Sequence, residues 1–122
     1  MKKLALTLFF MSAAVFAQTL ESANVAGKWK VHTSMAGSDT DQDCTFTQKD
    51  SDFTGECTSD QGTVKIKGKV DGKNITWSYD SEYSGTPLTV KYTGKFDSGK
   101  IAGDAAVDQF GVSGDFTATQ AK

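Results

Sequence analysis

Residues 44–57 read CTFTQKDSDFTGEC, and this stretch decides the fold. A two-residue turn at Asp50-Ser51 places Cys44 opposite Cys57 on two antiparallel strands. Counted outward from that turn, the two cysteines fall at a non-hydrogen-bonded pair, where facing side chains lie closest. The face of the cysteines also carries the apolar or small residues Phe46, Phe53 and Gly55. The opposite face is polar, so the stretch predicts a β-hairpin with one register.

The pairing of Cys44 with Cys57 predicts a cross-strand disulfide in an oxidising compartment. A metal or redox pair is the alternative. It would need further ligands, but the chain has two cysteines and one histidine. We therefore expect a structural disulfide and no metal site.

Hydrophobic and polar side chains alternate along the rest of the chain after residue 27, in short runs separated by Gly, Asp, Ser and Asn. Besides the hairpin, runs beginning near residues 27, 62, 74, 88, 100 and 110 give six more strands. The sequence thus predicts an all-β, eight-stranded antiparallel up-and-down meander closed into a small barrel with one cross-strand disulfide. An open sandwich of two sheets is the alternative that the pattern leaves open.

The N-terminus has the pattern of an export signal. Lys2 and Lys3 precede an apolar run that ends at Val15-Phe16-Ala17, with small residues at the positions a signal peptidase requires. We therefore expect a signal peptide at 1–17, an N-terminal tail at 18–26 and a barrel domain at 27–122. The protein would be periplasmic or secreted from a bacterium, without a membrane anchor.

Composition excludes one class of partner. All 13 basic residues are lysine, and the net charge of −2 becomes −4 once Lys2 and Lys3 are removed with the leader. Arginine is the usual reader of phosphate and guanine. An acidic chain without arginine is therefore not expected to bind nucleic acid.

A meander places alternate connections at opposite ends of the barrel. The short turns at 50–51, 72–73 and 98–99 share one end, here called the closed end. The connections 36–43, 58–63, 80–87 and 108–109 share the other, here called the mouth. The connections at the mouth carry no lysine, but they carry seven acids: Asp39, Asp41, Asp43, Asp60, Asp80, Glu82 and Asp108. We expect this acidic mouth either to attract a cation or to keep the protein soluble.

No catalytic motif is present. Asp39, Asp41 and Asp43 resemble the start of an EF-hand loop, but Cys44 stands where that loop needs glycine. The single histidine, His32, lies on the polar face of the first strand, so no nucleophile–base set can be assembled. We predict that the protein is not an enzyme and needs no cofactor.

Four large inward-facing aromatic residues are the candidate ligand contacts: Trp29, Trp77, Tyr79 and Tyr92. Such residues are either plain core or the lining of a shallow pocket near the mouth. A bound ligand would be a small neutral or cationic molecule, because a mouth without lysine disfavours anions.

Gly27-Lys28-Trp29 resembles the G-x-W start of the calycins, the group of lipocalins, fatty-acid-binding proteins and avidins. The whole chain is also similar to small exported bacterial β-barrel domains of unknown function, through Thr54-Gly55 and the terminal Gly114, Phe116 and Ala118. The chain lacks the size and terminal helix of lipocalins. A weaker resemblance, over Gly27 to Phe46, is to periplasmic metalloprotease inhibitors, which insert their N-terminal segment into a protease.

These resemblances imply a monomeric lipocalin-like binding protein that takes a small molecule. The alternatives are a module that binds another exported protein, such as a protease inhibitor, and a structural envelope protein without a ligand.

Overall fold

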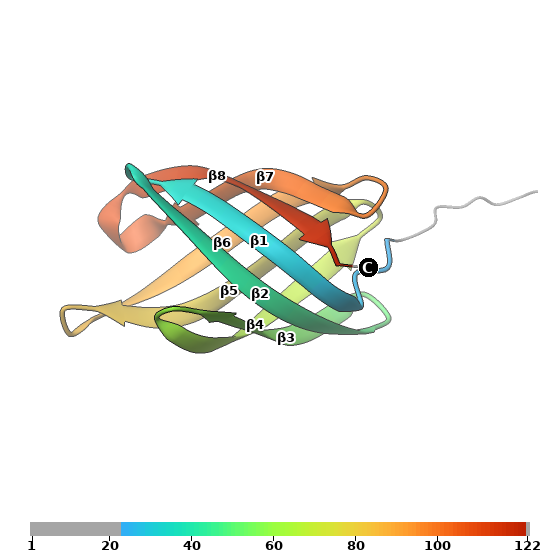
Figure 1. Ribbon diagram of the computed structural model, residues 1–122, viewed down its shortest axis with the longest axis horizontal. Helices are drawn as coiled ribbons and strands as arrows, with labels where there is room; N and C mark the ends of the chain where they lie inside the picture. Colours follow the sequence, from blue (N-terminus) through green and yellow to red (C-terminus); the bar gives the residue numbers. More distant parts are fainter. Residues whose placement is uncertain (1–22, 122) are drawn as a thin grey trace, which may run out of the picture.

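The computed structural model describes residues 23–121. Eight antiparallel strands close into a barrel in sequence order (Figure 1). Their bounds are β1 Gly27–Met35, β2 Ser38–Lys49, β3 Asp52–Ser59, β4 Gly62–Asp71, β5 Asn74–Tyr83, β6 Thr86–Phe96, β7 Lys100–Val107 and β8 Val112–Gln120. A short 3-10 helix, η1 (Asp108–Phe110), precedes β8. The meander and its closure are confirmed, and the sandwich is excluded because β1 pairs with β8.

The register of the β2–β3 hairpin is the predicted one. Lys49 pairs with Asp52 and Cys44 with Cys57. The two cysteines form a disulfide, with their Cα atoms 4.0 Å apart. Disulfides are typical of compartments outside the reducing cytosol. The leader expected at 1–17, and residues 18–22 of the expected tail, lie outside the described residues.

Aromatic rings fill the middle of the barrel. Trp77 stacks on Tyr92 with ring centroids 4.8 Å apart, and Phe116 meets both rings edge-on. Phe46 and Phe53 continue the cluster toward the closed end. Three inward-facing glycines, Gly55, Gly68 and Gly94, make room for the rings of Phe46, Phe53 and Phe116. A Cβ on Gly68, for example, would lie 2.5 Å from the Phe53 ring, so only glycine fits there.

Residues 23–26 seal the closed end. Ala23 donates its N–H to the Gly72 carbonyl (2.9 Å), and Val25 donates to Gln48 Oε1 (2.7 Å). The Trp29 indole N–H in turn donates to the Val25 carbonyl (2.8 Å). Ala23 and Val25 are both buried. This part of the expected tail therefore packs beneath the barrel.

The mouth differs from the prediction. The long connections expected at 36–43 and 80–87 are two-residue turns, at Ala36-Gly37 and Ser84-Gly85. All four turn residues have positive φ, as tight hairpin turns of type I′ require. The flanking segments contain Asp, Ser and Pro, which are uncommon inside strands, but they continue the strands because each residue pairs across the hairpin. Strand eight begins at Val112 rather than at Phe110, which lies in η1.

Within the described residues, no helix is long and apolar enough to cross a membrane.

Candidate functional site

The seven acids predicted at the mouth are all exposed, but most of them lie on strands rather than in loops. Asp39, Asp41 and Asp43 point outward from β2, Asp80 and Glu82 lie on β5, Asp60 lies in the β3–β4 turn and Asp108 opens η1.

Lysines on the neighbouring strands neutralise part of this charge. Lys30 on β1 pairs with Asp43 (3.0 Å), and Lys91 on β6 pairs with Asp108 (3.2 Å). The mouth is therefore less negative than its connections alone indicate.

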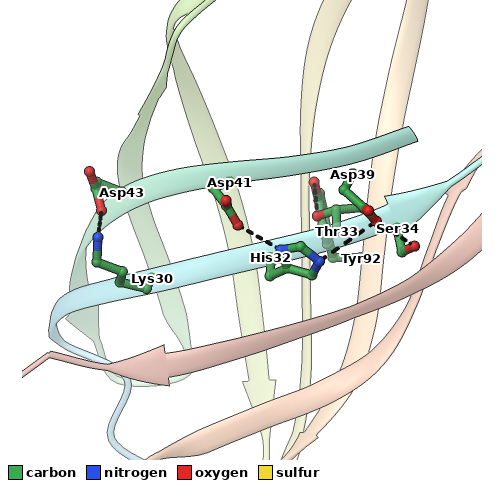
Figure 2. Close-up of polar contacts among 8 residues, drawn as sticks. All are labelled: Lys30, His32, Thr33, Ser34, Asp39, Asp41, Asp43 and Tyr92. Atoms are coloured by element: carbon green, nitrogen blue, oxygen red, sulfur yellow. Dashed lines mark hydrogen bonds and ion pairs between the residues drawn. The ribbon is translucent and has the colours of Figure 1, made fainter.

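His32 lies between two of these acids on the outer face of β1 (Figure 2). Its Nδ1 lies 2.6 Å from Asp41 Oδ1, and its Nε2 lies 3.7 Å from Asp39 Oδ1. The hydrogen bond to Asp41 raises the pKa of His32 above 6.5, desolvation opposes it, and the charges of Asp41, Asp39 and Asp115 add to the rise. The contact between His32 and Asp41 thus ties β1 to β2. The described residues contain no group of three side chains suited to holding a metal ion.

A polar network lies inside the barrel, on the side of the aromatic cluster toward the mouth. The hydroxyls of Thr33 and Tyr92 are 3.3 Å apart, and Figure 2 shows this pair behind β1. The pKa of Tyr79 is influenced by the neighbouring side chains of Tyr92 and Gln42. Apart from the aromatic residues, Thr33 and Gln42 are the only polar residues that are buried within the described chain.

Burial is the main reason why the pKa values of Tyr79 and Tyr92 are raised, so both phenols stay neutral at physiological pH. The sequence prediction missed Thr33 and Gln42. Their positions, two residues from Val31 and from Cys44, place them on the inward face and could have identified them.

The structure separates the four predicted aromatic contacts. Trp29 lies at the closed end, where it packs on Phe46 and Phe96 with centroids 6.2 and 6.3 Å away. Trp77, Tyr92 and Tyr79 form one stack that runs toward the mouth. Of the four, Tyr79 alone is partly exposed. The accessible end of the candidate site is therefore Tyr79.

Three more partly exposed apolar residues pack against the core near the mouth ends of their strands: Met35, Val64 and Val112. Leu88 also faces inward at this level and is 9% exposed. At the closed end Ala23 and Val25 are buried, and a hollow of 370 Å³ lies on the surface beside Ala23, Gln48 and Asp50. At the mouth, partly exposed apolar residues lie at the same end of the barrel as the polar network.

The line along which β4 and β5 meet, here called the seam, is open at the mouth end of the barrel. Their ladder ends at the pair Lys67–Ser78, although β4 continues to Gly62 and β5 to Tyr83. These five-residue continuations remain paired to β3 and β6 on their other sides. The seam is therefore split from Ile66 and Tyr79 to the hairpin tips.

A groove of 580 Å³ lies on the outer surface between the β1–β2 and β3–β4 hairpins. Its lining is polar and consists of Lys30, residues 39–43 and residues 58–61. It forms because the β2–β3 ladder ends at Asp43–Thr58, while β2 continues to Ser38.

These features can bind and orient a molecule by hydrogen bonds and apolar contact. The architecture is that of an eight-stranded barrel, consistent with the calycin group. Comparison with known proteins finds no match to a protein-family model, to a curated protein or to a solved structure.

Proposed function

We propose that this chain is an exported, non-enzymatic binding protein of the calycin type. Its ligand is a small neutral or cationic molecule with an apolar part, held at the mouth. The observation that carries the proposal is the cluster of polar side chains formed by the buried Thr33, Tyr92 and Gln42 and the partly exposed Tyr79. Polar groups inside an apolar barrel lower its stability unless they are satisfied, so their clustering at the end of the barrel where Tyr79 is partly exposed supports a role in recognition.

The structure limits the depth of such a site. Stacked rings occupy the centre of the barrel from Trp77 to Phe53. A ligand would therefore rest on Tyr79 and Val64 instead of entering a deep cavity. We expect modest affinity and a ligand smaller than those of lipocalins.

Charge sets the preference among ligands. Asp80 and Glu82 are exposed on β5, which also carries Tyr79. Their field favours a cation over an anion, and salt screens it.

Inhibition of a protease through the N-terminal segment receives less support. That mechanism needs a free segment, but Ala23 and Val25 are hydrogen-bonded beneath the barrel.

Tryptophan fluorescence tests the proposal, because Trp77 stacks on Tyr92 and reports on the site. Titration with decylamine, decanol and decanoate should give binding in the order amine, alcohol, carboxylate. The gap between amine and carboxylate should narrow as salt rises.

Replacing Tyr79→Phe keeps the ring but removes its hydroxyl, and should weaken decanol binding about 2- to 10-fold, the worth of one hydrogen bond. Thr76→Val, on the outer face of the same strand, is the matched control and should bind like the parent protein. The proposal fails if none of the three probes binds, or if decanoate binds most tightly.

A further inference from the structure

The split seam exposes the backbone of β4 and β5, and hairpin geometry tells which groups face it. Residues that flank a two-residue turn form a hydrogen-bonded pair, and pairs then alternate along the ladder. From the turn Ser84-Gly85, Glu82 and Asp80 therefore fall at non-hydrogen-bonded pairs with β6. Their N–H and C=O groups point away from β6, into the seam.

The alternation of hydrogen-bonded pairs, counted along β4, shows that β4 also points backbone groups into the seam. From the turn Asp60-Gln61, Thr63 and Lys65 fall at non-hydrogen-bonded pairs with β3, so their backbone groups point toward β5. The ladder across the seam stops at Lys67–Ser78, so these groups have no strand partner there. Four N–H and four C=O groups thus line the two edges. Unpaired edges of this kind accept an additional strand.

The side chains beside the seam specify the chemistry of that strand. Asp80 and Glu82 point outward from β5 and are exposed, whereas Tyr79 faces inward and is partly exposed. A strand that pairs with this edge would place every second side chain beside the two carboxylates. The side chain between the two that face the carboxylates would lie opposite Ser81, and the next inward side chain would lie opposite Tyr79.

A second copy of the chain fits the β5 edge poorly. An antiparallel pairing of two such edges would place Asp80 and Glu82 of one copy beside the same acids of the other. Like charges on facing strands are destabilising.

We propose that the β5 edge of the split seam binds an extended segment of another exported protein, in which lysine or arginine alternates with apolar residues. The segment adds antiparallel to residues 79–83. Its basic residues lie opposite Asp80 and Glu82 and exchange backbone hydrogen bonds with them. This inference goes beyond the small-ligand site and does not depend on it.

A peptide of alternating lysine and valine, eight residues long, is the probe. Fluorescence anisotropy of the labelled peptide measures binding to the protein. Hydrogen exchange followed by NMR should show that the amides of Asp80 and Glu82 become protected. N-methylation of the lysine amides, which face β5 in this register, should abolish binding, whereas N-methylation of the valine amides should leave it. An alternating glutamate–valine peptide should not bind.

Variants of Glu82 distinguish the contribution of its backbone N–H to peptide binding from the contribution of its side-chain charge. Glu82→Pro removes the N–H that faces the seam, but Glu82 donates no hydrogen bond to β6, so the β5–β6 ladder should survive. This variant should bind the peptide about 10-fold or more weakly. Glu82→Gln keeps the donor and should lose only about 2- to 5-fold.

Equal binding by the two N-methylated peptides, or no protection of the Asp80 and Glu82 amides, would overturn the proposal. So would a dimer of the free protein in sedimentation that dissociates in Glu82→Pro, because a second copy would then occupy the edge. If decylamine and decanol bind in the fluorescence titrations but the peptide does not bind, the small-ligand site is supported and the peptide site is refuted.

Discussion

Reducing the disulfide should lower the free energy of unfolding by about 3 kcal/mol. The bridge spans a sequence separation of 13 residues, and the chain-entropy model gives about this value for a loop of that size. Cys44 and Cys57 are 2% and 1% exposed. The reduced thiols keep the same buried atoms in the core but must move apart, because non-bonded sulfurs cannot approach as closely as bonded ones. Reduction therefore reports mainly the loop contribution, together with a small local repacking. Domains of this size are stable by about 5–15 kcal/mol in total, so the loss is large.

Urea unfolding with and without reductant measures the effect. With a slope of about 2 kcal/mol per molar urea, the midpoint should fall by about 1.5 M. The double variant Cys44→Ala/Cys57→Ala is the comparison, and should be less stable than the reduced protein because it also removes buried sulfur atoms. A loss below about 1 kcal/mol on reduction would refute the reasoning. It would mean that the unfolded chain keeps the hairpin ends together without the bridge.

Three further predictions concern packing and protonation. Gly68→Ala should lower the free energy of unfolding by about 2–3 kcal/mol in the same urea assay, because the new Cβ would lie 2.5 Å from the Phe53 ring. The pKa of Tyr79 is raised by burial, so its stabilising contribution should be full below about pH 10 and lost as pH rises above it. Absorbance of the ionised phenol should show Tyr79 titrating later in the folded than in the unfolded protein. The His32 pKa, followed by NMR, should lie above 6.5 and fall in Asp41→Asn. Its contribution should be present below pH 6.5 and disappear as pH rises through the raised pKa.

Much of the fold could be predicted because a barrel with one buried face leaves a period-two signal. The cysteines, the turn at residues 50–51 and the alternation of Phe46 and Phe53 all give the same register, and that register is observed. A shift by one residue would turn every core side chain outward.

The mouth could not be predicted in the same way. The segment Ser38-Asp-Thr-Asp-Gln42 has the composition of a loop, and only its pairing with β1, including the contact of Asp41 with His32, makes it a strand. The split between β4 and β5 leaves no mark in either strand, since each keeps its pattern on its other side. The position where two strands diverge depends on the twist of the whole barrel, which local sequence does not encode.

The sealing of the closed end also decides how the molecule can be attached to anything else. The described residues begin at Ala23 and end at Ala121. The N–H of Ala121 donates a hydrogen bond to the Lys28 carbonyl (2.8 Å). Both points lie at the closed end, opposite the tips of the β1–β2 and β5–β6 hairpins (Figure 1). A reporter, bead or display scaffold fused to either terminus would therefore leave the hairpin tips facing solution. A circular permutant that joins the two termini by a short linker and opens the Asp60-Gln61 turn would move the attachment point to the mouth, and would present the opposite face of the barrel.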